Sequence, residues 1–212
     1  MKQKTEIRTM AGIARPMLSE GAETAQEGRT ISGYAIVFNQ PSKVLCDGAG
    51  AFIETISRTA LTEEKLRQWD IRALLEHNPE RLLARWRQGD GTLTLAIDEV
   101  GLRYSFTAPD TEDGRTAVEL VRRGDIVGSS FAYLCDESTV EWGRNADGTP
   151  TRRVNDITYM EDVSIVSRPA YDQTSVNVRM LEKCNESDEE AKFALYIKRA
   201  RHDAEKAVKI EI

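Results

Sequence analysis

The stretch TLTLAIDEVGLRYSFTA, residues 92–108, gives the clearest indication of the fold. Apolar residues alternate with polar ones on both sides of a turn at residues 98–101. The first arm carries Leu93, Leu95 and Ile97, and the second carries Leu102, Tyr104, Phe106 and Ala108. Alternation with period two is typical of a strand with one buried face, so this stretch predicts an antiparallel hairpin.

Further strand patterns lie on both sides of this hairpin. Residues 30–39 (TISGYAIVFN), 126–135 and 158–167 are rich in β-branched and aromatic residues and end near turn formers. Residues 116–123 fit a short helix that is closed by Gly124. We therefore expect a β-rich α+β domain, with a closed antiparallel β-barrel as its core and helices at the periphery.

The two ends of the chain differ from this body. Residues 1–29 are polar and mostly aperiodic, which predicts a flexible N-terminal segment before a domain over residues 30–180. Residues 181–212 form a predicted C-terminal helical tail, in which apolar residues recur at helical spacing after an acidic start. This amphipathic helix either docks onto a partner or remains solvated, and the pattern leaves both interpretations open.

Composition excludes several functional classes. The chain has 212 residues and a formal net charge of −6, which argues against a general nucleic-acid binder. No apolar run approaches the roughly 20 residues that a membrane helix needs. The first residues lack the apolar core of a secretory signal, so we expect a protein that is not secreted. Metal-ligand spacings and phosphate-binding loops are missing from the sequence, and we expect neither a metal nor a cofactor.

His77 is the first candidate for a chemical role, because only one other histidine, His202, occurs in the chain. Imidazole titrates near neutral pH and can serve as a general base. The alternative is a structural histidine that is hydrogen-bonded to the backbone at the end of a strand. In that predicted strand His77 shares a face with Ile71, Ala73 and Leu75.

Two pairs of neighbouring residues are further candidates. Ser129 and Ser130 follow a glycine, and a serine nucleophile would require a base and a group that orients that base. Glu161 and Asp162 lie within an apolar strand, where a carboxylate needs a partner because an unpaired buried charge is costly. That partner is either a structural arginine or a histidine, and the strand pattern does not decide between the two acids.

Several segments, taken in order, resemble the prohead (capsid maturation) proteases of tailed bacteriophages, a family related to the herpesvirus assembly proteases. The resemblance extends over about residues 30–179. The matching segments are GYAIVF (33–38), FIETI (52–56), ALLEHN (73–78), GTLTL (91–95), GL (101–102), GDIVGSSF (124–131), EDVSIVSRPAY (161–171) and residues 174–179.

This resemblance implies a serine peptidase with a β-barrel core wrapped by helices, herpesvirus-protease-like in its fold. By motif, Ser130 corresponds to the nucleophile, His77 to the base and Asp162 to the acidic third member, with Glu161 as the alternative. Arg168 is the implied candidate for stabilising the oxyanion. The implied mechanism needs no metal and no cofactor.

The resemblance also implies partners and a location. The expected substrates are the scaffold protein, the scaffolding segment of the major capsid protein and the enzyme itself, inside a prohead that assembles in the host cytoplasm. Self-association is left open. Two other classes of function remain: a catalytically inactive scaffold or assembly protein that retains the protease fold, and an unrelated β-barrel binding module in which His77 and Ser130 are structural.

Overall fold

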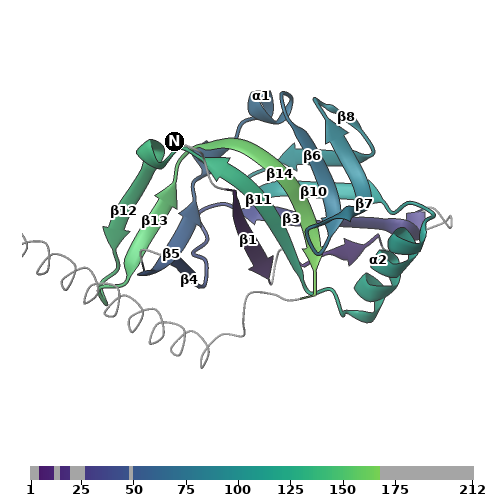
Figure 1. Ribbon diagram of the computed structural model, residues 1–212, viewed down its shortest axis with the longest axis horizontal. Helices are drawn as coiled ribbons and strands as arrows, with labels where there is room; N and C mark the ends of the chain where they lie inside the picture. The colour runs from purple at the N-terminus through teal and green to yellow at the C-terminus, as the bar shows by residue number, and fades with distance from the viewer. Residues whose placement is uncertain (1–4, 12–14, 20–26, 48–49, 168–212) are drawn as a thin grey trace, which may run out of the picture.

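The structure, a computed structural model, describes residues 5–11, 15–19, 27–47 and 50–167 and forms three open sheets (Figure 1). The six-stranded sheet has the order β1 (Glu6–Ala11), β11 (Gly128–Cys135), β14 (Ile157–Val166), β6 (Asp70–Leu75), β7 (Asn78–Arg87) and β8 (Asp90–Gly91). A second sheet has the order β2 (Met17–Leu18), β3 (Thr30–Val37), β10 (Gly101–Thr107) and β9 (Leu93–Ile97). The third has the order β12 (Val140–Arg144), β13 (Pro150–Val154), β5 (Gly50–Ile56) and β4 (Val44–Asp47).

The helices are short and peripheral. They are α1 (Glu63–Leu66) and α2 (Glu112–Arg123), with 3₁₀ turns at Glu27–Arg29, Arg58–Ala60 and Glu137–Thr139. In Figure 1, α2 and the third sheet lie at opposite ends of the molecule, with β1 and β11 between them. Gly124 ends α2 with a φ of 81°, as the sequence predicts, and the Thr111 side chain caps the start by accepting the Gly114 N–H.

The predicted hairpin is confirmed. β9 and β10 pair antiparallel, with Leu95 opposite Tyr104 and Leu93 opposite Phe106. All four side chains are buried, so the period-two pattern marks the core face correctly. Tyr104 packs over Gly33 in β3, where a Cβ would lie only 2.7 Å from the tyrosine hydroxyl.

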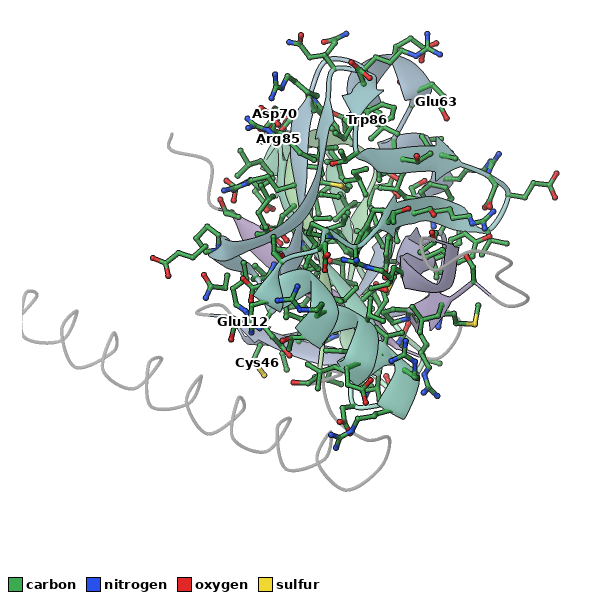
Figure 2. The ribbon with its side chains drawn as sticks, turned by 90° about the vertical axis from the view of Figure 1, so that its right-hand side faces the viewer. Cys46, Glu63, Asp70, Arg85, Trp86 and Glu112 are labelled. Carbon is green, nitrogen blue, oxygen red and sulfur yellow. The ribbon has the colours of Figure 1, made fainter. Side chains whose placement is uncertain are left out.

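The core fills the space between the sheets and is closed at one side by α1. Leu66, the last residue of α1, is fully buried, and its carbonyl accepts a 2.8 Å hydrogen bond from the indole N–H of Trp86 in β7. Beside them, Arg85 and Asp70 form an ion pair that joins β7 to β6 at the surface (Figure 2). These contacts fix the β6–β7 hairpin, whose turn carries His77.

The prediction of a closed antiparallel barrel is wrong. The described strands form open sheets, and two pairs, β6 with β14 and β5 with β13, run parallel. Alternation along a strand reports which face is buried and does not report which strand lies beside it. The predicted C-terminal amphipathic helix falls within residues 168–212, outside the described residues.

The N-terminal region also differs from the expectation of a flexible segment over residues 1–29. Residues 6–11 form β1, which pairs with β11 in register from Glu6 opposite Tyr133 to Ala11 opposite Gly128. A strand at a sheet edge gains its stability from a partner that is distant in sequence, and this strand is therefore invisible to local patterns. The domain boundaries at residues 30, 180 and 181 stay predictions. None of the described helices has the length and apolarity that are needed to cross a membrane.

Replacing Gly101 by alanine tests the packing of β10 against β3. A Cβ at this position would lie 1.8 Å from the backbone oxygen of Ile36, and backbone atoms cannot move aside cheaply. We expect Gly101→Ala to lower the free energy of unfolding by about 2–3 kcal/mol, measured by urea denaturation. Gly148→Ala is the control, because alanine would be strained by the positive φ of this position but would meet no neighbouring atom. We expect this variant to lower the free energy of unfolding by about 1 kcal/mol. Equal losses for the two variants would contradict the close approach.

Candidate active site

His77 lies in the two-residue turn between β6 and β7. Glu76 and His77 have φ values of 57° and 54°, a left-handed region that residues other than glycine rarely adopt. Leu75 pairs with Asn78 across this turn, so the predicted strand ends at Leu75 and does not continue through His77. The Glu76 N–H donates to the Ile165 carbonyl at 3.1 Å, which ties the turn to the end of β14.

Ser129 and Ser130 are neighbours in β11 and therefore point to opposite faces of the sheet. The Ser129 hydroxyl forms a 2.8 Å hydrogen bond with the Tyr104 hydroxyl in the core. Ser130 faces the other way, and its Oγ lies 2.5 Å from Nε2 of His77. Among the described contacts, the serine that meets the imidazole is Ser130.

The two acidic candidates are separated in the same way on β14. The Glu161 carboxylate accepts a 3.0 Å hydrogen bond from the Thr5 hydroxyl and takes no part in the contact with His77. Asp162 is 5% exposed, and its Oδ1 lies 2.7 Å from Nδ1 of His77. The Ser164 hydroxyl donates to the same Oδ1 at 2.7 Å, so a second buried side chain holds the carboxylate in place.

Ser130, His77 and Asp162 thus form a continuous chain of contacts from hydroxyl to imidazole to carboxylate. The Asp162 oxygen lies off the direction of the ring N–H, and Nδ1 has no hydrogen-bond partner among the described residues. A carboxylate beside Nδ1 favours the tautomer with the proton on that nitrogen. The Nε2 lone pair then faces Ser130, which is the arrangement in which imidazole can accept the hydroxyl proton.

β1 covers this group of side chains. Thr9 stands opposite Ser130 in the β1–β11 register, and its hydroxyl donates to the Ser130 Oγ at 3.1 Å. The Ser130 Oγ also lies 2.8 Å from the carbonyl oxygen of Arg8, so its single proton has two alternative acceptors, this oxygen and Nε2 of His77. Ser130 is fully buried as a result. The Arg8 carbonyl, which belongs to the chain itself, therefore lies next to the Ser130 hydroxyl.

A cluster of buried and half-buried charges holds β1 from its other face. Nε and Nη2 of Arg8 donate to the two oxygens of Glu54 in β5, at 2.6 and 2.9 Å. Glu54 also accepts from the Tyr133 hydroxyl at 3.0 Å and from Arg152. The Arg152 guanidinium donates in turn to both oxygens of Glu6, each at 2.8 Å. Burial alone would lower the pKa of Arg152, but Tyr133 and the two carboxylates raise it above its ordinary value.

Three potential metal ligands, Glu6, Cys135 and Glu137, lie close together beside this cluster. Nη2 of Arg152 already donates to all three, at 2.8, 3.2 and 2.6 Å respectively. Burial raises the pKa of the Cys135 thiol to about 11, so the sulfur is a neutral thiol near pH 7. The three groups therefore accept hydrogen bonds from the Arg152 guanidinium.

Sequence patterns miss β1, Glu54 and Arg152. EIRTMA, residues 6–11, alternates only over its first three residues, so no local signal marks this strand or its partner. Arg168, the predicted oxyanion group, lies outside the described residues. The contact between His77 and Ser130 is the opposite of what an unrelated binding module predicts. A hydroxyl, an imidazole and a carboxylate that contact one another in this order can carry out acyl transfer.

Comparison with known proteins agrees with this chemistry. Residues 17–189 match the family described as Caudovirus prohead serine protease. No curated protein matches the chain. Among solved structures, the capsid assembly protease of bacteriophage T4 shares 10% sequence identity with a TM-score of 0.46, over 77% of this chain and 99% of that one. A likeness at this TM-score does not establish a common fold. The family match alone spans most of the sequence, and by that match the chain belongs to the caudovirus prohead serine protease family.

Proposed function

We propose that this chain is a serine endopeptidase in which Ser130 is the nucleophile, His77 the general base and Asp162 the group that orients the imidazole. The observation that carries the proposal is the 2.5 Å contact between the Ser130 Oγ and Nε2 of His77, with the Asp162 carboxylate 2.7 Å behind the ring. Membership in the prohead serine protease family supports the same reaction class.

In the first half of the reaction, the Ser130 Oγ attacks the carbonyl carbon of a peptide bond as its proton passes to Nε2 of His77. The imidazolium that forms is stabilised by the Asp162 carboxylate. The tetrahedral intermediate collapses when His77 returns the proton to the nitrogen of the leaving amine, which breaks the C–N bond and leaves an acyl ester on Ser130.

In the second half, a water molecule loses a proton to His77 and attacks the ester carbonyl. Collapse of the second intermediate breaks the bond to the Ser130 Oγ, which takes back the proton from His77, and releases the carboxylic acid product. Each developing oxyanion needs hydrogen-bond donors, a contribution of about 3 kcal/mol per donor in well-studied enzymes. Arg168 remains our candidate for positioning such a donor.

The chain's own N-terminal segment is the first substrate that we propose. The Arg8 carbonyl oxygen lies 2.8 Å from the Ser130 Oγ, and β1 runs antiparallel to β11 as an added strand. Extended peptides commonly bind in this way to a sheet edge. We propose that the enzyme cleaves itself between Arg8 and Thr9, which separates the part of β1 up to Arg8 from the chain and leaves Thr9 as the new N-terminus.

The substrates in trans follow from the family. We propose that they are the scaffold protein and the scaffolding segment of the major capsid protein, cleaved inside a prohead that assembles in the host cytoplasm. The protease domain over residues 30–180 would act on them, and the tail over residues 181–212 would dock the enzyme onto its partners. The alternative, an inactive assembly protein with the protease fold, predicts assembly without any dependence on Ser130.

Ser130→Ala should abolish processing. Because the hydroxyl oxygen is the attacking atom, we expect the rate of substrate cleavage to fall by more than about 1,000-fold. The measurement is the intact mass of the chain and of the co-expressed capsid and scaffold proteins. Ser129→Ala is the matched control, since Ser129 bonds Tyr104 in the core and its loss should leave processing nearly unchanged. Normal processing by Ser130→Ala would refute the assignment of the nucleophile.

Ser164→Ala tests how the acid is held. Without the Ser164 hydroxyl, the Asp162 carboxylate loses a 2.7 Å hydrogen bond and with it part of its fixed orientation. A hydrogen bond to a charged group contributes about 1.5–3 kcal/mol, so we expect kcat to fall about tenfold or more. Ser164→Thr, which keeps a hydroxyl, should recover much of this loss. The measurement is kcat in a peptidase assay with both variants. If the alanine variant retains full kcat, Ser164 does not orient Asp162.

A further inference from the structure

We infer that Glu54 and Arg152 form a paired recognition site that selects a substrate strand with arginine at the cleaved position and glutamate two residues before it. This inference rests on the proposed function and deepens it by naming the substrate class. Arg8 and Glu6 are the residues of β1 that occupy the two places. They share one face of the strand, opposite to the face on which Thr9 meets Ser130.

The position of the arginine relative to the nucleophile is fixed by the backbone. The carbonyl of Arg8, and no other carbonyl of β1, accepts a hydrogen bond from the Ser130 Oγ among the described contacts. Main-chain pairing between β1 and β11 fixes this register and is available to any extended sequence. Selectivity must therefore come from the side chains of the added strand and from the groups that they meet.

Glu54 meets the Arg8 side chain with two-point geometry. Nε bonds Oε1 at 2.6 Å and Nη2 bonds Oε2 at 2.9 Å, so both carboxylate oxygens engage the fork of the guanidinium. A lysine ammonium can satisfy only part of this arrangement, because it is a point charge without a planar fork. Glutamine in place of the arginine would leave the Glu54 carboxylate with one hydrogen bond fewer. Glutamate in that position would put a like charge beside it.

Neighbouring side chains also hold the recognition groups in place. Glu54 is 2% exposed, and the Tyr133 hydroxyl and Arg152 hold its two oxygens from the side away from β1. Arg152 is 3% exposed and presents two N–H groups to Glu6, each at 2.8 Å. Preorganised and largely dry charged groups discriminate strongly, because a mismatched partner leaves a buried charge uncompensated. A small cavity lined by Arg8, Met10, Lys43 and Glu54 lies alongside.

The chain supplies an independent substrate for the test. The order Glu-Xaa-Arg-Thr occurs at Glu6–Thr9 and again over residues 27–30, as EGRT. In the folded chain the Arg29 carbonyl accepts the Ala108 N–H, away from Ser130. A synthetic peptide with the sequence of residues 25–34, AQEGRTISGY, therefore presents the same order free of any structural role that Arg8 has in this protein.

The experiment measures cleavage of this peptide by the wild-type chain, expressed at full length and allowed to process itself, with product masses as readout. We expect cleavage after the arginine, at a rate at least about tenfold above that of the peptide with glutamine in its place. Two further peptides, one with lysine in place of the arginine and one with glutamine in place of the glutamate, should be cleaved at rates between those of the first two. Glu54→Gln should bring the ratio of the arginine and glutamine rates toward unity, whereas the exposed Glu141→Gln should leave it unchanged.

The ratio of two peptide rates within one variant does not depend on how much of that variant is folded or has processed itself, so a destabilised or slowly processed Glu54→Gln still gives a decisive result. Equal rates for the arginine and glutamine peptides, or an unchanged ratio in Glu54→Gln, would overturn this inference alone. A wild-type chain that cleaves neither itself nor any peptide, as is expected of Ser130→Ala, would overturn the proposed function and the inference together.

Discussion

The pairing of β11 with β14 is the constraint on which the site depends. Ser130 stands opposite Ser164, and Ala132 stands opposite Asp162, so one register sets the nucleophile, the acid and the hydroxyl that holds the acid. β14 also pairs in parallel with β6, whose turn carries His77. Side chains alternate between the faces of a strand, and a slip of one residue would turn Ser130 into the core and present Ser129 in its place. Burial of both faces of β11 makes such a slip costly.

A second constraint acts on the N-terminal strand. Its main chain pairs with β11, while Arg8 and Glu6 enter a buried cluster with Glu54 and Arg152. Removing one member of such a cluster leaves an uncompensated charge and costs about 3–5 kcal/mol, whereas removing Arg8 and Glu6 together removes one charge of each sign. Glu54 and Arg152 remain paired with each other in that case. Cleavage after Arg8 would therefore let Glu6 and Arg8 leave together without leaving an isolated buried charge.

Local patterns predict the parts of this protein that local sequence determines. The β9–β10 hairpin and the Gly124 end of α2 are confirmed, because alternation and a left-handed cap are properties of neighbouring residues. The barrel is wrong, since the choice of strand partners depends on residues far apart in the chain. Motif resemblance brought Ser130, His77 and Asp162 together, and spacing alone would not have separated Asp162 from Glu161. Glu54, Arg152 and β1 carry no motif, so only the folded chain reveals that they surround the nucleophile.

The central claim is that the chain presents its own Arg8 carbonyl to a serine–histidine–aspartate site. A crystal structure of the full-length Ser130→Ala variant tests it most directly, because this variant cannot remove the strand. We expect β1 paired with β11, the Arg8 guanidinium on Glu54, the Arg8 carbonyl directed at residue 130, and Nδ1 of His77 in contact with Asp162. A β1 strand docked elsewhere, or an imidazole turned away from both residue 130 and Asp162, would contradict it.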